Sequence, residues 1–266
     1  MLPAETVKKR IQLARRTLEE ANVTLDLPPA EQLDERLNTV HDVLCLMFNE
    51  GYSTSFGQEP IRDNICEEAA RLCHLLCNSD FVVPSTKALL ALFLFNASRL
   101  DAGTDVDGTV ILLKDKDRSQ WDAFLIRSGG NWLSKSKTDR PGIFHLEAAI
   151  AMQHSTASSV DSTDWNAIVQ LYDRLSLFRE SPVYILNRAV AVGQAGDPHL
   201  ALQQLRTLKN HPRMMAYPLL ECACSRMHEL LGDPGAAAEC LTAALALTTA
   251  PHEKQLLEKK LQSLIG

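Results

Sequence analysis

The sequence predicts an all-α protein made of stacked antiparallel helical hairpins. Apolar residues make up 45% of the 266 residues and charged residues 23%, which is a globular balance. Within the chain, apolar residues recur at helical spacing in one segment after another. Prolines and glycines mark the boundaries, because proline suits the first turn of a helix and glycine the residue after its end. The prolines expected at helix starts are Pro3, Pro84, Pro182, Pro198, Pro234 and Pro251.

These signals place twelve helices in order, near 3–21, 30–49, 61–78, 84–100, 117–136, 141–158, 163–178, 182–195, 197–209, 213–231, 234–248 and 251–265. Gly129-Gly130 predicts a break or kink inside the fifth of them. Strand character is confined to residues 109–113, where we expect either a short β-hairpin near 107–114 or an extended loop, and no proper sheet.

The last hundred residues have a repetitive pattern. Short turns such as Gly196-Asp197-Pro198 and Gly232-Asp233-Pro234 separate helices of about 15 residues. Small residues after the second turn, Ala237 and Ala244, would let two antiparallel helices approach closely. This pattern predicts a tetratricopeptide-like right-handed array, although no clear repeat of about 34 residues is visible.

Charge is unevenly distributed along the chain. The net charge is −6, yet residues 6–18 carry five basic side chains and no acid. On a helical wheel, Lys8, Lys9, Gln12, Arg15 and Arg16 lie opposite an apolar stripe. The sequence therefore predicts one basic helix attached to an acidic body.

Membrane insertion and secretion are not expected. The longest apolar run covers eight residues, 88–95, whereas a membrane-spanning helix needs about 20. The N-terminus lacks a secretory pattern, so we expect a cytoplasmic protein without a membrane partner. The seven cysteines fit reduced, buried thiols. Cys66, Cys73 and Cys77 share a helical spacing, which leaves a metal or redox site as the alternative.

Catalytic motifs are weak throughout. Asp105-Val-Asp107-Gly108 fails as a calcium loop, because its twelfth position is Lys114 instead of a bidentate glutamate. No G-x-S-x-G, H-E-x-x-H or phosphate-binding glycine loop occurs. We expect no cofactor and no enzymatic activity. The alternative is an enzyme, such as a hydrolase, with a site around Glu50, Asp117 and Arg118.

Four clusters combine polar and aromatic residues within apolar helices. They are Asn49-Glu50 with Tyr52, Asp117-Arg118 with Trp121, Asp164-Trp165, and Asn187-Arg188. One interpretation is structural: acids and arginines pair or cap helices, with Asp164 placed to cap the helix that follows it. The other is a partner-binding surface, since Trp, Tyr and Arg are the usual anchors of interfaces.

At these clusters the sequence resembles the long C-terminal extension of extracytoplasmic-function RNA polymerase sigma factors that bear a tetratricopeptide-like domain. The matching stretches, in the family's order, are LMFNEGY at 46–52, KDRSQWD at 116–122, FHLEAAIA at 144–151, TDW at 163–165 and SPVYILNRAVAV at 181–192. Together they extend over nearly the whole chain. Lys116 departs from the glutamine expected there.

The resemblance implies that residues 2–18 are the recognition helix of sigma region 4. Lys8, Lys9, Gln12, Arg15 and Arg16 would then face the major groove of the −35 promoter element. The implied domains are a region 4 remnant (1–24), a helical first part of the extension (25–158) and tetratricopeptide-like repeats (159–266). Sigma region 2 and the first helices of region 4 have no counterpart in the sequence. We therefore expect a truncated chain, a mis-started reading frame or one half of a split gene, which binds promoter DNA weakly if at all.

By this resemblance the chain is expected to be a regulatory, protein-interaction module in transcription initiation. Its partners would be the sigma factor domains and RNA polymerase. The alternative is a free-standing helical-repeat scaffold for an unrelated protein partner.

Overall fold

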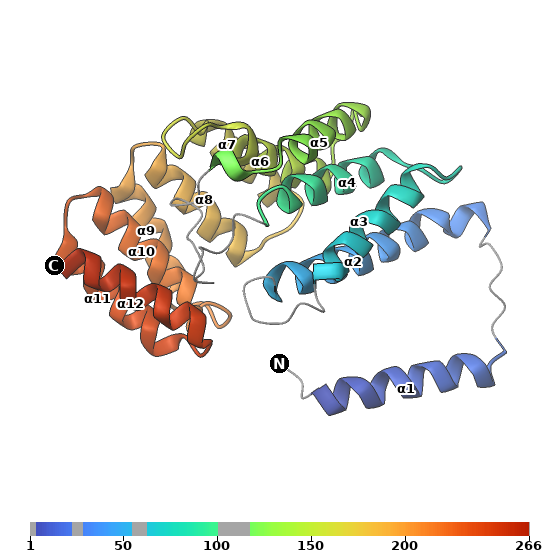
Figure 1. The fold of residues 1–266 in the computed structure, drawn as a ribbon, viewed down its shortest axis with the longest axis horizontal. Coiled ribbons are helices and arrows are strands. Elements are labelled where there is room, and N and C mark those ends of the chain that lie inside the picture. The colour runs from blue at the N-terminus through green and yellow to red at the C-terminus, as the bar shows by residue number, and fades with distance from the viewer. Residues whose placement is uncertain (1–3, 23–28, 55–62, 101–117, 266) are drawn as a thin grey trace. The chain divides into compact units, whose positions relative to one another are not determined.

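A computed structural model confirms the all-α fold class and describes residues 4–22, 29–54, 63–100 and 118–265 (Figure 1). No strand occurs within these ranges, and the hairpin predicted near 107–114 lies outside them. The helices are α1 (Ala4–Glu20), α2 (Ala30–Thr54), α3 (Asp63–Cys77), α4 (Pro84–Ala97), the 3-10 helix η2 (Arg118–Gln120), α5 (Ala123–Lys135), α6 (Ile143–Thr156), α7 (Trp165–Ser176), α8 (Pro182–Gln194), α9 (Pro198–Leu208), α10 (Pro218–Leu230), α11 (Pro234–Leu247) and α12 (Pro251–Ile265).

The chain divides into two compact units, residues 1–40 and 41–266. The first holds α1 and the beginning of α2. The second holds the rest of α2 and all later helices. The predicted domain boundaries at residues 24 and 158 stay predictions from the sequence.

In the second unit, each helix from α3 onward packs against its neighbour in the chain, apart from the link through η2. Connections of three to five residues between α7 and α8, α8 and α9, α10 and α11, and α11 and α12 make these neighbours antiparallel. The fold therefore consists of helical hairpins packed in series, as an array of helical repeats requires (Figure 1).

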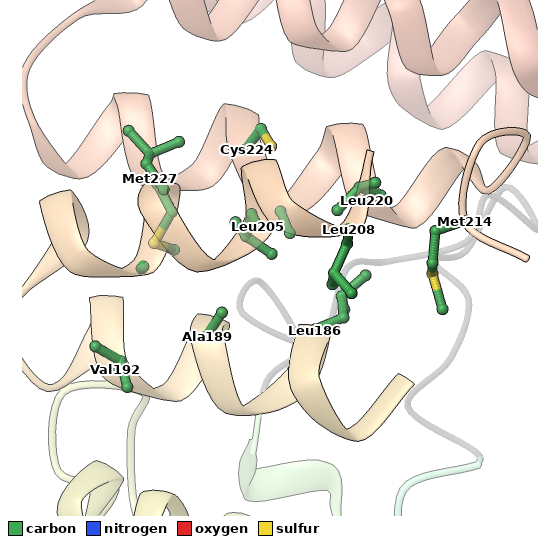
Figure 2. Packing of buried hydrophobic residues seen from close by; sticks show 12 residues of the cluster. Leu186, Ala189, Val192, Leu205, Leu208, Met214, Leu220, Cys224 and Met227 are labelled. Carbon is green, nitrogen blue, oxygen red and sulfur yellow. The ribbon is translucent and has the colours of Figure 1, made fainter. Parts of the chain in front are cut away.

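Two large clusters of buried apolar side chains stabilise the two ends of this array. Near the N-terminal end, Phe48 from α2 stacks on Phe93 from α4, with ring centroids 4.4 Å apart. In the C-terminal part, α8, α9 and α10 enclose a second core, in which Leu186 and Leu205 are buried beside Met227 (Figure 2). Burial of such side chains contributes about 1.5–3 kcal/mol each.

Turn chemistry fixes the hairpins of the C-terminal part. Gly196 and Gly232 adopt positive φ angles of 113° and 73°, which favour glycine. The aspartate after each glycine caps the next helix: Asp197 accepts a 2.9 Å bond from the Leu200 amide, and Asp233 accepts a 3.0 Å bond from the Ala236 amide. The same three-residue turn thus reverses the chain twice.

Four features of the helices differ from the sequence prediction. The helix expected over 117–136 is instead the 3-10 helix η2 followed by α5, which begins only at Ala123. The break expected at Gly129-Gly130 is wrong: α5 continues through both glycines, and Gly129 packs closely against the Phe95 ring. The helix expected from residue 213 begins only at Pro218, which occupies a first-turn position. The helix expected to end near residue 49 continues through a buried Gly51.

Candidate functional site

The basic face predicted for the first helix is exposed in the first unit. Lys9, Gln12, Arg15 and Arg16 are all exposed side chains of α1, and Lys8 lies in the same helix. Arg16 Nε lies 2.6 Å from Glu20 Oε1, one helical turn away, with both side chains more than half exposed. Such an exposed pair contributes little stability, so Arg16 remains available to another ligand.

Two large apolar side chains of α1 are exposed as well. Leu13 is 65% exposed and Leu18 is 56% exposed. A 17-residue helix is only marginally stable without a packed face. These leucines therefore offer α1 a second contact surface, chemically different from its basic face.

The second predicted cluster forms a buried contact between η2 and α6. Arg118 donates from Nη1 to the carbonyl oxygens of His154 (3.1 Å) and Ala157 (2.8 Å) at the end of α6. The guanidinium carbon also lies 4.9 Å from the centre of the Trp121 ring, and Trp121 is buried. Arg118 thus satisfies carbonyls that a helix end leaves unpaired. Asp117 lies outside the described residues.

The third cluster, like the second, contacts the C-terminal end of α6. Asp164 caps α7 by accepting a 2.9 Å bond from the Ala167 amide, which confirms the predicted cap. The Trp165 ring meets the His154 ring edge to face, 5.4 Å between centroids, and Trp165 Nε1 donates to the Val160 carbonyl at 3.0 Å. Arg118 of the second cluster and Trp165 of the third therefore both contact the C-terminal end of α6.

His154 and Arg99, which lie beside Arg118, were not singled out by the sequence. Burial, together with Arg99 and Arg118, lowers the pKa of His154 to about 4, so the ring is neutral at pH 7. Arg99 is itself buried and hydrogen-bonds Asn96 Oδ1. A buried histidine beside two arginines has no sequence pattern, because the three lie on separate segments.

The fourth cluster lies at the contact of α7, α8 and α9. Arg188 Nε pairs with Asp173 Oδ1 at 2.6 Å and its Nη1 donates to Gln204 Oε1 at 3.2 Å, so it links α8 to α7 and α9. Asn187 hydrogen-bonds Tyr172, and burial raises the pKa of Tyr172 to about 12. Both residues thus join neighbouring hairpins.

A partly buried polar pair, Tyr184 and Glu147, lies beside that cluster and was also missed. Tyr184 donates to Glu147 Oε1 at 2.7 Å, and burial raises the pKa of Glu147. Burial, with the Glu147 and Asp42 charges, raises the pKa of the Cys45 thiol to about 12. Neither carboxyl nor thiol is prepared for nucleophilic chemistry, since a reactive thiol requires a lowered pKa.

The first cluster lies near the end of α2, in a different apolar core. Asn49 and Glu50 are exposed beside the buried Phe48, and Tyr52 lies in the last turn of the helix. Of the three residues of the alternative enzyme site, Glu50 is exposed on α2, Arg118 binds the end of α6, and Asp117 lies outside the described ranges.

The cysteines of α3 lie in the apolar core. Cys66, Cys73 and Cys77 are all buried. Cys66 donates to the Phe48 carbonyl and Cys73 to the Thr86 carbonyl. Within the described ranges, no three His, Cys, Asp or Glu side chains are arranged to hold a metal ion. An open hollow in the loop between α5 and α6 is lined by Lys137, Thr138 and Asp139, none of them a predicted site residue.

The predicted residues therefore fall into two groups. The motif residues at Arg118, Trp121, Asp164, Trp165, Asn187 and Arg188 join one helix to the next. The basic residues of α1 are exposed and open to a partner. In the part of the chain that the structure describes, no helix combines the length and apolar character needed to cross a bilayer.

Comparison with known proteins gives two matches. Residues 36–137 match a family of unknown function, DUF6596. The chain is also 34% identical to an uncharacterized protein of Rhizobium meliloti over 259 residues, which cover 97% of this chain and 61% of that protein. The chain thus spans about three fifths of the length of this relative. No solved structure matches the chain.

Proposed function

We propose that the chain is a regulatory, protein-interaction module of an extracytoplasmic-function sigma factor that acts in transcription initiation, and that it is not an enzyme. The observation that carries the proposal is the exposed basic face of α1 in a chain with a net charge of −6. Clustered cations on one helix face are the electrostatic footprint of a nucleic-acid-binding helix.

Two further findings support this proposal. DUF6596, matched by residues 36–137, is associated with sigma-70-like proteins. The motifs of the resembled sigma extensions make the contacts between successive hairpins, as expected if they maintain an interaction scaffold. In this proposal α1 supplies the contact to promoter DNA and the hairpin array supplies the contact to sigma domains or core polymerase.

The DNA contact is tested by fluorescence anisotropy with a labelled duplex of 30 base pairs at low salt. An isolated recognition helix reads DNA weakly, so we expect a dissociation constant of about 10–100 µM that weakens steeply with salt. The triple reversal Lys9→Glu/Arg15→Glu/Arg16→Glu should abolish this binding. A matched reversal of exposed cations in the second unit, Arg127→Glu/Lys137→Glu/Arg140→Glu, changes the net charge equally and should leave binding within about twofold.

The protein contact is tested by capture of purified bacterial core RNA polymerase, or of isolated sigma regions 2 and 4, on the immobilised chain. We expect saturable capture that survives the α1 triple reversal, because the array makes this contact. The proposal is contradicted if the chain captures neither partner and if both triple variants bind DNA equally well. That result would favour the alternative function, a helical-repeat scaffold for an unrelated protein partner.

A further inference from the structure

Exposed apolar side chains gather at one end of the C-terminal hairpins. Because α7 to α12 alternate in direction, the ends of α7, α9 and α11 and the starts of α8, α10 and α12 lie at the same end of the array. Six large apolar residues exposed at this end form what we call the apolar ridge: Leu177, Phe178, Val183, Met215, Leu219 and Leu247. Leu200 and Leu230 are the exposed counterparts at the opposite end.

The apolar ridge includes strongly exposed side chains. Leu177 is 86% exposed and Phe178 is 54% exposed, side by side in the connection between α7 and α8. Met215 and Leu219 are 66% and 54% exposed at the next connection, before and at the start of α10. Exposed apolar side chains that gather at one end of an array are typical of a site of protein or membrane contact.

The charge around the ridge is opposite in sign to that of the whole chain. The three connecting segments, 174–183, 206–219 and 247–254, carry six lysines and arginines and only two acids, Glu180 and Glu253. All six cations are exposed, and one of them, Lys209, pairs with Glu221 at 2.8 Å. An apolar track flanked by cations is complementary to a partner that combines apolar side chains with carboxylates.

We propose that the apolar ridge binds an acidic amphipathic helix of a protein partner. Such a helix would place its Leu or Phe side chains on the ridge and its Asp or Glu side chains beside cations such as Arg179 and Arg213. About 15 residues of helix span about 22 Å, enough to cross two helices packed 8–10 Å apart. The proposal rests on the protein-interaction role proposed above and is independent of DNA binding by α1.

An anionic membrane is the competing ligand, since basic residues beside exposed leucines also suit a lipid surface. The arrangement favours a peptide for a physical reason. Glu180 lies beside Arg179, and Glu253 beside Lys254, so a uniform sheet of phosphates would meet repulsion at both acids. A peptide can place a neutral or basic side chain opposite each of them.

The test uses a fluorescein-labelled amphipathic peptide of 18 residues, with Leu and Phe on one face and Glu on the other. Its controls are the same peptide with Lys for Glu and a scrambled acidic peptide. Anisotropy with the full chain should give at least tenfold tighter binding of the amphipathic acidic peptide than of either control. Equal binding of the three peptides would overturn the proposal.

Variants locate the site. Leu177→Ser/Phe178→Ser and Arg179→Glu/Arg213→Glu should each weaken the acidic peptide at least tenfold, whereas Leu200→Ser/Leu230→Ser at the opposite end should change it less than twofold. Unchanged melting temperatures verify folding of each variant, since all these side chains are exposed. Equal loss in the opposite-end variant contradicts a site at the ridge.

Two further measurements separate the explanations. Co-sedimentation with phosphatidylglycerol vesicles, together with no peptide binding, would replace the proposal with a membrane contact. The triple reversal Lys9→Glu/Arg15→Glu/Arg16→Glu should leave peptide affinity unchanged. If the full chain binds the acidic peptide but neither DNA nor polymerase, the result counts against the sigma-factor role alone. If it binds DNA or polymerase but not the peptide, the result counts against the apolar ridge alone.

Discussion

Gly193 shows how much a single residue controls the approach of two helices. A Cβ at this position of α8 would lie 2.0 Å from Met227 Sδ and 3.2 Å from Ala201 Cβ. Met227 is fully buried in the core between α8, α9 and α10, so its side chain has little space to move (Figure 2). Glycine is therefore required here for packing, at a helix position where alanine is intrinsically better.

We predict that Gly193→Ala destabilises the fold by about 1–2 kcal/mol, as overpacking outweighs the gain in helix propensity. The matched control is Gly130→Ala in α5, where nothing lies within 4 Å of the added Cβ, and which should stabilise by about 0.5–1 kcal/mol. Urea unfolding measures both changes. If the collision with Met227 is the cause, Gly193→Ala costs less in a Met227→Ala background; an unchanged cost would contradict it.

At the residue scale, the sequence predicted side chains that act locally and missed those that act across the fold. The Asp164 cap joins residues three positions apart and follows from helix chemistry. Arg118 reaches carbonyls 36 and 39 positions away, so its cluster was recognised but its partner was not. His154 and Glu147 were missed because their environment exists only once helices distant in sequence are packed.

At the scale of elements, proline and aspartate were the reliable signals. The starts of α4, α8, α9, α11 and α12 were predicted at or within one residue of their observed positions, because each has a proline in its first turn. Glycine misled the prediction twice: Gly51 and Gly129 lie inside helices, and both are buried. A glycine that ends a helix and one that admits a neighbouring helix look alike in sequence.

The cap of α9 gives a test at this scale. Asp197 Oδ1 accepts from the Leu200 amide, so Asp197→Ala should destabilise the protein by about 1 kcal/mol through loss of that bond. Asp197→Asn keeps a side-chain oxygen at the same place and should change stability by less than about 0.5 kcal/mol. Chemical denaturation compares the two. A loss of similar size in both variants would assign the effect to the aspartate charge at the helix N-terminus instead of to the hydrogen bond.

At the scale of the whole molecule, the chain has two positively charged surfaces in spite of its net negative charge. One is the basic face of α1 and the other is the apolar ridge with its flanking cations, and we expect them to bind different ligands. Helix α1 carries exposed cations on one face and two exposed leucines elsewhere on its surface. The apolar ridge mixes cations and apolar side chains on the same edge. Duplex DNA suits the first arrangement and an amphipathic peptide the second, so salt should weaken DNA binding more steeply than peptide binding.

The buried histidine makes the stability of the whole second unit depend on pH. The folded-state pKa of His154, about 4, lies below its ordinary value of 6.5, so the unfolded chain binds the proton more readily. Its contribution is therefore fully present above about pH 6.5 and is lost as the pH falls toward 4. From this difference we expect the histidine to remove about 2–3 kcal/mol of stability between pH 7 and pH 4.5.

The variant His154→Phe isolates this contribution. It keeps a ring against Trp165 and removes Nδ1, which is buried without a hydrogen-bond partner among the described residues. Urea unfolding at pH 7 and pH 4.5 should show the wild-type chain losing about 2–3 kcal/mol more than the variant. Equal losses would mean that His154 can be protonated in the folded state without cost, and hence that burial and the charges of Arg99 and Arg118 do not lower its pKa.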